Sequence, residues 1–188
     1  MTDRLLENSP LNFHGSITLD LMASKIWICD TLRDLGLTDF STIYILGSWY
    51  GNMAYVLAKT HIQFNKVINV DINAKWLHRS ELILRGLGLA DKVESMKTDA
   101  NDLDYHQLDS DGLVINTSVQ DIDGLDWWRH IPKNTLVVLQ DRDSSRDGVR
   151  SLQEFNTLYP MRETLYLEEK HLKDPETPYR RFLKIGRK

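Results

Sequence analysis

The chain has 188 residues, of which 41% are hydrophobic and 27% are charged, proportions that are ordinary for one globular domain. Lys and Arg number 23 against 27 Asp and Glu, so the formal net charge is −4 at pH 7. This mild acidity provides no general attraction for nucleic acid and argues against a nucleic-acid partner. We attribute most of the one basic cluster to alternation in a terminal strand; it comprises Arg180, Arg181, Lys184, Arg187 and Lys188.

The sequence predicts a cytoplasmic protein that does not enter a membrane. No stretch approaches the roughly 18 apolar residues of a membrane span, and the opening MTDRLLENSP lacks the apolar core of a signal peptide. The single cysteine, Cys29, lies in an apolar helical pattern and is expected to be a buried residue in a reducing compartment. The histidines show no metal-ligand spacing, so no metal site is expected. The oligomeric state cannot be read from the sequence.

The first 40 residues are expected to form an N-terminal segment and a cover helix, with residues 41–188 as the main domain. After a loop-like opening, Ser16 is a plausible N-cap for a long amphipathic helix that ends at Gly36. Its apolar positions are Ile17, Leu19, Leu21, Met22, Ile26, Trp27, Ile28 and Leu32.

Short apolar runs then alternate with helical patterns. Five strands are predicted, at residues 42–46, 66–72, 93–98, 113–116 and 135–140. Helices are predicted at residues 53–58, 74–86, 125–130 and 146–158, with a short helix or loop around Tyr105. Trp127 and Trp128 are expected to cover the sheet. Such alternation predicts an α/β fold with a parallel sheet covered on both faces.

The end of the chain breaks this alternation. Residues 162–168 and 179–185 are two strand patterns joined by the polar segment KDPETP, with no helix between them. Consecutive strands joined in this way run antiparallel. The sequence therefore predicts a three-layer α/β sandwich whose seven-stranded, mostly parallel sheet ends in an antiparallel C-terminal hairpin.

A glycine-containing segment, LGSWYGNMAYVLA, follows the first strand. Gly47 suits the tight turn, Gly51 suits a close approach of two backbones, and the next helix directs free N–H groups at a ligand. Together with the order of elements from Thr42 onward, it resembles the D-x-G-x-G-x-G loop of the Rossmann-like class I S-adenosylmethionine (SAM)-dependent methyltransferases. Gly47 and Gly51 match the first and third glycines.

The resemblance implies SAM as the cofactor and predicts where it binds. Asp71 ends the second strand about 20 residues beyond the loop, where a carboxylate can accept both ribose hydroxyls; a helix cap is the alternative for Asp71. Asp99 would bond the adenine amino group, Ala100 would offer its N–H to the ring, and Asn116 would lie beside the transferred methyl. The full predicted set is Gly47, Ser48, Trp49, Tyr50, Gly51, Asn52, Asp71, Ile72, Asp99, Ala100 and Asn116.

Three departures from the family pattern bear on the chemistry. Ile45 stands where the family has the acid that orients the methionine ammonium, so that end of SAM must be held differently or not at all. Trp49 replaces the middle glycine and would narrow the pocket. The segment Asn116 to Ser118 lacks the prolines and aromatic of an Asn/Asp-Pro-Pro-aromatic motif, which removes the main support for base or glutamine methylation.

The catalytic residues cannot be assigned from the sequence, and four are candidates: Asn116, Gln140, Tyr50 and His14. Trp49 and Tyr50 either pack on the N-terminal helix or line the site. His14 is either a lid residue or a surface histidine. Gln140 and Asp141 end the fifth strand on the same rim, and Asp143 and Ser144 suit helix capping.

The resemblance implies a SAM-dependent methyltransferase, and we expect a small-molecule substrate. Methyl transfer chiefly requires alignment of the acceptor and exclusion of water, so the lack of a readable nucleophile–base pair is compatible with it. Two alternatives remain open: a lyase or cyclase that attacks within SAM itself, suggested by Ile45 and Trp49, and a non-catalytic SAM-binding or interaction protein.

Overall fold

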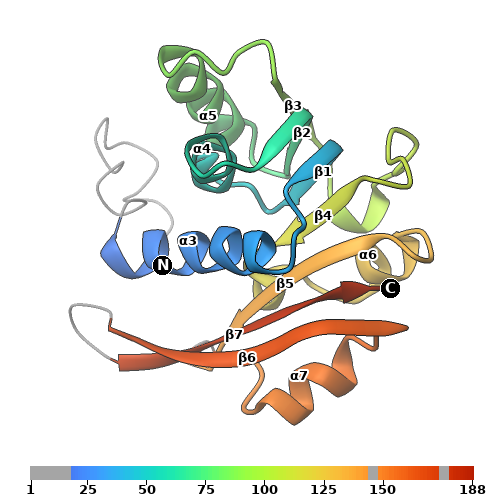
Figure 1. Ribbon diagram of the computed structural model, residues 1–188. Helices are drawn as coiled ribbons and strands as arrows, with labels where there is room; N and C mark the ends of the chain where they lie inside the picture. Colours follow the sequence, from blue (N-terminus) through green and yellow to red (C-terminus); the bar gives the residue numbers. More distant parts are fainter. Residues whose placement is uncertain (1–17, 144–147, 174–177) are drawn as a thin grey trace.

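The computed structural model describes residues 18–143, 148–173 and 178–188 (Figure 1). Within these residues one seven-stranded sheet has the order β3-β2-β1-β4-β5-β7-β6. Strands β1 to β5 are parallel, β7 is antiparallel to β5, and β6 is antiparallel to β7. The strands are β1 (Asp39–Leu46), β2 (Gln63–Asp71), β3 (Val93–Lys97), β4 (Leu113–Asn116), β5 (Leu136–Arg142), β6 (Glu163–Lys173) and β7 (Pro178–Arg187).

Helices cover both faces of the sheet, which confirms the predicted three-layer sandwich with its antiparallel hairpin. The described helices are α3 (Leu19–Asp34), α4 (Asn52–Lys59), α5 (Ala74–Gly86), α6 (Asp126–His130) and α7 (Leu152–Leu158), with 3-10 turns η1 (Ala100–Asp102) and η2 (Val119–Asp121). The division at residue 40 stays a prediction, although α3 shares a core with the sheet.

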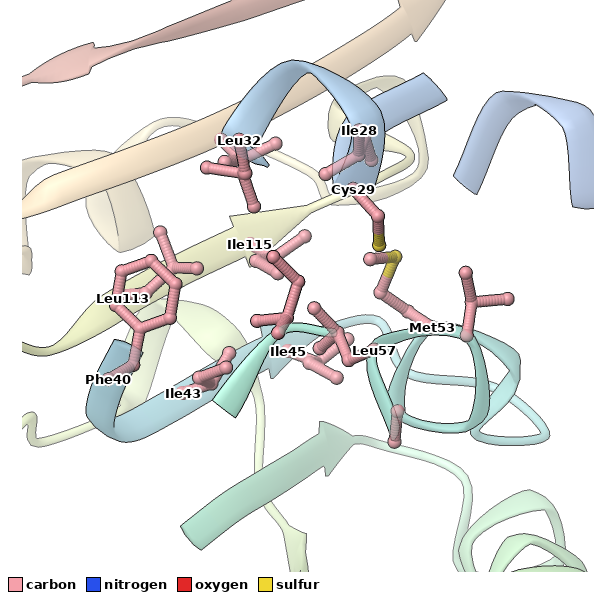
Figure 2. Close-up of a cluster of buried hydrophobic side chains, with 14 of the residues drawn as sticks. Ile28, Cys29, Leu32, Phe40, Ile43, Ile45, Met53, Leu57, Leu113 and Ile115 are labelled. Carbon is pink, nitrogen blue, oxygen red and sulfur yellow. The ribbon is translucent and has the colours of Figure 1, made fainter. Parts of the chain in front are cut away.

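Alternate strand residues fill two separate cores because successive side chains of a strand point to opposite faces. Ile43 and Ile45 of β1 join the core under α3 and α4, whereas Tyr44 and Leu46 join the core with α6 and α7. Figure 2 shows the first core, with residues of α3 above the strands. Trp127 and Trp128 are buried in the second core, as predicted.

Cys29 belongs to α3 and faces α4. Its side chain is buried and points towards Met53 of α4 (Figure 2). Burial raises the pKa of the Cys29 thiol to about 11, so the reactive thiolate is scarce at neutral pH. This confirms the prediction of a buried, structural cysteine.

Two sequence-based expectations for the region of α7 are wrong. The helix predicted at residues 146–158 begins at Leu152, where the Ser151 hydroxyl accepts the Glu154 N–H at 3.1 Å. Asp143 does not cap it but pairs with Arg180 at 2.8 Å; Ser144 lies outside the described residues.

The buried face of α3 differs from the predicted apolar face. Leu19 is 92% exposed and Ile26 is 43% exposed, while Asp20, Ser24 and Lys25 are buried. The explanation of the basic cluster as strand alternation also fails, because β7 is covered on both faces. Arg181 and Lys184 are therefore both buried.

Candidate functional site

A cavity of about 680 Å³ lies at the carboxyl ends of the parallel strands. It lies beside the point where β1 is flanked by β2 on one side and β4 on the other, which is where open α/β sheets bind their ligands. Its volume is in the range of small-molecule sites. Of the predicted cofactor residues, the cavity is lined by Gly47, Ser48, Trp49, Asn52, Asp71, Ile72, Asp99 and Ala100.

The glycine-containing loop takes a left-handed path at three positions. The φ angles are +61° at Gly47, +50° at Trp49 and +76° at Gly51. A Cβ at Gly51 would collide with the Ser80 hydroxyl and lie 3.0 Å from Leu84 Cδ1, so this glycine permits the loop before α4 to approach α5 closely. A Cβ at Gly47 would meet open space. Trp49 thus keeps the conformation that favours glycine, in the position of the family's middle glycine.

Asp71 holds this loop to the end of β2. One carboxylate oxygen accepts the Trp49 N–H at 2.9 Å, and the other accepts the Asn73 N–H at 2.8 Å. Burial raises the pKa of Asp71, and the two hydrogen bonds oppose that rise. The cap of α5 is Asn73, whose side chain accepts the N–H groups of Lys75 and Trp76. The helix-cap alternative for Asp71 is therefore wrong.

An aromatic group borders the cavity. The Trp49 ring lies 4.8 Å from Tyr50 and 6.3 Å from Trp76, measured between centroids. Trp49 and Trp76 line the cavity, but Tyr50 is buried and does not. Trp49 therefore lines the site, as one alternative expected, while its ring packs on α5. Ile72 adds an apolar surface that is 65% exposed.

Asp99 and Ala100 form the next part of the wall. One oxygen of the Asp99 carboxylate accepts the Asn101 N–H at 2.8 Å and so caps the start of η1. The side chain of Asn101 in turn accepts the Trp127 N–H at 2.9 Å. Asp99 is thereby fixed at the rim with its carboxylate beside the cavity.

The structure does not bring the remaining predicted residues into the lining. Asn116 is fully buried and accepts the Ser118 N–H at 3.0 Å. Gln140 is also fully buried and donates to the Ser24 carbonyl at 3.0 Å. Gly51 packs against α5, and His14 lies outside the described residues. Catalytic roles for Asn116, Gln140, Tyr50 and His14 remain predictions.

Sequence reasoning missed a charged part of the wall contributed by α3, β5 and β7. Lys25, Arg142 and Arg181 line the cavity together with Asp20 and further residues after β4. A signal for Lys25 was present, because Leu21, Lys25, Ile28 and Leu32 lie on one face of a helix at four- and three-residue spacing. A lysine among three apolar residues on that face indicates burial.

The described residues contain neither a cluster of metal ligands nor a membrane-spanning helix. They contain no group of three or more His, Cys, Asp or Glu placed to hold a metal ion. None of their helices is long and apolar enough to cross a membrane.

Comparisons with solved structures identify the fold. A methyltransferase from Galdieria sulphuraria, provisionally assigned to sarcosine and dimethylglycine, has a TM-score of 0.68 at 13% identity, covering 89% of this chain and 86% of that one. Magnesium protoporphyrin IX methyltransferase from Synechocystis PCC 6803 with bound SAM has a TM-score of 0.64 at 13% identity, covering 97% and 88%. A SAM-dependent methyltransferase from Aquifex aeolicus has a TM-score of 0.61 at 15% identity, covering 83% and 87%.

The chain thus has the fold of the class I SAM-dependent methyltransferases, as the resemblance predicted. No protein-family model matches the sequence. No curated protein matches it either.

Proposed function

We propose that the protein is a SAM-dependent methyltransferase acting on a small molecule. The observation that carries this is the single cavity in which the Asp71 carboxylate and the left-handed loop form one side, while α3, β5 and β7 form the other. One cavity of about 680 Å³ can therefore hold a nucleoside-containing cofactor and a small acceptor side by side.

The residues of the first side fit the adenosyl group. Each Asp71 oxygen accepts one backbone N–H, and a carboxylate offers about four lone-pair sites, so roughly two remain for the ribose hydroxyls. The open space above Gly47 lets a ligand approach the backbone closely. The buried Ser48 hydroxyl has no partner among the described residues, and Ile72 supplies an apolar surface for a base.

The chemistry asks little of the protein beyond positioning. Bound SAM supplies an electrophilic methyl group together with its own leaving group. The cavity walls would orient the acceptor and keep out water. Ile45 is apolar and buried, so an acid elsewhere must accept the methionine ammonium; Asp20 and Asp121 both line the cavity.

Ligand titration of the Asp71→Asn variant tests the proposal. We expect SAM and S-adenosylhomocysteine to bind the wild-type protein, whereas NAD does not. The variant should bind both adenosyl ligands more weakly by roughly 1.5–3 kcal/mol, because it loses charge-assisted hydrogen bonds. Asparagine is used because its one oxygen still accepts either the Trp49 or the Asn73 N–H, whereas alanine would leave both without an acceptor. A thermal melt of the variant measures the cost of the hydrogen bond that is lost.

Asn73→Ala is the matched control. It removes the α5 cap, two residues from Asp71, and should cost about 1 kcal/mol of stability with unchanged ligand affinity. Calorimetric titration and thermal melting measure the two quantities. Affinity for NAD equal to that for SAM, or no affinity for any adenosyl ligand, would refute the cofactor assignment.

A further inference from the structure

Two buried cations face the cavity on the side away from Asp71. Lys25 of α3 is 8% exposed and Arg181 of β7 is 2% exposed. They are 156 residues apart in the sequence and are brought together because α3 lies across the sheet beside β5 and β7 (Figure 1). Buried charged groups are costly unless they are paired, so this arrangement calls for a partner.

Arg181 is held at the end of β4. Its guanidinium donates to the Thr117 carbonyl, and a longer hydrogen bond of 3.4 Å reaches Gln140 Oε1. Both acceptors are neutral, so they fix the orientation of the guanidinium without neutralising its charge. The end of β4 is two strands from the end of β2, or roughly 10 Å from the proposed ribose site. The guanidinium therefore lies over the part of the cavity left for an acceptor.

Lys25 has no hydrogen bond or ion pair within the described part of the chain. Burial lowers the pKa of Lys25 to about 7. The positive charge of Arg181 lowers this pKa further, and the negative charge of Asp20 raises it by a smaller amount. The Asp20 carboxylate accepts the Tyr179 hydroxyl at 2.8 Å. The negative charges of the buried Asp141 and of Asp121, which lines the cavity, both act on Arg181 and not on Lys25. The ammonium of Lys25 thus lacks a full counter-charge.

We propose that Lys25 and Arg181 form an oxyanion subsite for the methyl acceptor, so that the acceptor is a small molecule bearing a carboxylate or a phosphate. A lysine and a planar guanidinium that converge from two elements suit such a group. The inference rests on the proposed function, because the acceptor is defined by methyl transfer.

Titration of inorganic phosphate and of acetate tests the subsite. Each is added to the full chain, once alone and once saturated with S-adenosylhomocysteine. We expect both anions to bind in both forms, and Lys25→Met to weaken their binding at least tenfold at pH 6.5. Arg33→Met removes a positive charge from an exposed position on the same helix and should change anion affinity less than twofold. Equal anion affinity in wild type and Lys25→Met, or no binding of either anion, would overturn the proposal.

A second titration separates an acceptor subsite from a site for the carboxylate of the cofactor. S-adenosylhomocysteine carries that carboxylate, and 5′-methylthioadenosine does not. We expect Lys25→Met to leave both affinities within twofold of wild type. A tenfold loss for S-adenosylhomocysteine alone would assign Lys25 to the cofactor and overturn the proposal. If neither adenosyl ligand binds wild type, the proposed function fails, whereas anion binding still reports on Lys25.

Arg181→Lys tests the second cation of the subsite with a substitution that keeps a positive charge and so is expected to fold. It keeps the positive charge but loses the planar geometry that reaches Thr117 and Gln140. A cooperative melt together with at least fivefold weaker phosphate binding supports the subsite, and unchanged phosphate binding in this folded variant counts against it.

Discussion

At the scale of single residues, the cavity joins groups whose chemistry is set by their burial. Asp71 was predictable from the sequence because an acid ending the second strand, about 20 residues beyond a glycine loop, is a local pattern. Its hydrogen bonds to Trp49 and Asn73 were not, because they depend on the loop conformation. The burial of Lys25 could have been found from its spacing with Leu21, Ile28 and Leu32, but its position beside Arg181 could not, because that depends on α3 and β7 meeting in space.

Lys25 should make the stability of the free protein depend on pH. Its pKa falls from an ordinary 10.5 to about 7, with burial as the main cause, and Arg181 and Asp20 are the charged groups acting on it. Between these two pH values the unfolded chain binds a proton at Lys25 that the folded chain does not. The free energy of unfolding therefore rises with pH above 7, by up to about 1.4 kcal/mol per pH unit for one proton.

Urea unfolding of wild type and Lys25→Met between pH 6 and 8 measures this dependence. The variant should lose most of the rise above pH 7, and below pH 7 it should be the more stable protein because no charge is buried. Lys184, whose pKa is lowered to about 8 by burial, acts in the same direction at higher pH, which is why the range stops at pH 8. Identical slopes for the two proteins would contradict the assignment of a titrating Lys25.

At the scale of elements, most boundaries followed from the sequence, and the main failure, the buried face of α3, has a physical cause. Residues 74–86 were predicted as a helix and form α5 over the same range. For α3 the position was right but the buried face was partly wrong, because its N-terminal half lines a cavity rather than an apolar core. A polar wall accepts Asp20 and Lys25 on the inner side and leaves Leu19 outside.

Two glycines at the junction between β1 and α4, and a third just after α5, give a graded prediction. Gly47, Gly51 and Gly88 have φ angles of +61°, +76° and +75°, so alanine at any of them should cost about 1–2 kcal/mol in backbone strain. Gly51→Ala should cost more, because its Cβ also meets Ser80 and Leu84 of α5. In urea unfolding of the three variants, Gly51→Ala should have the lowest free energy of unfolding.

The same three variants separate strain from ligand contact. A Cβ would meet open space at both Gly47 and Gly88, but only Gly47 lines the cavity. Gly47→Ala should therefore weaken S-adenosylhomocysteine binding, while Gly88→Ala should leave it unchanged. Equal affinities in these two variants would show that the ligand does not approach the loop backbone.

At the scale of the whole molecule, the order of elements was sufficient to predict the directions of the strands, but not their spatial order, in which β7 lies between β5 and β6. Parallel strands need long crossovers and consecutive antiparallel strands do not, so five strand–helix units followed by two strands without a helix between them specify a parallel sheet with a terminal hairpin. What the fold leaves open is the reaction, because a shared fold hosts several chemistries. Ile45 of β1 and Trp49 of the following loop are the departures that raised attack within SAM as an alternative.

The structure provides a reason to expect ordinary methyl transfer. Trp49 follows the left-handed path of a glycine, and its ring packs beside Tyr50 and Trp76, so the cavity keeps a volume of about 680 Å³. We therefore expect the protein to leave SAM intact when no acceptor is supplied, because no nucleophile then lies in line with the methyl carbon. Mass spectrometry of SAM incubated with and without the protein measures this.

Methylthioadenosine is the diagnostic product of that incubation. If it forms only with the protein present, the reaction is attack within SAM and our assignment of methyl transfer is wrong. Trp49→Gly should then abolish this product, because glycine keeps the φ of +50° but removes the indole from the cavity wall.

If SAM stays intact, matched pairs of acceptors supply the complementary test. A carboxylic acid acceptor should yield S-adenosylhomocysteine and its neutral amide should not, because only the acid offers an oxyanion to Lys25 and Arg181. Loss of that discrimination in Lys25→Met would connect the reaction to the charged side of the cavity.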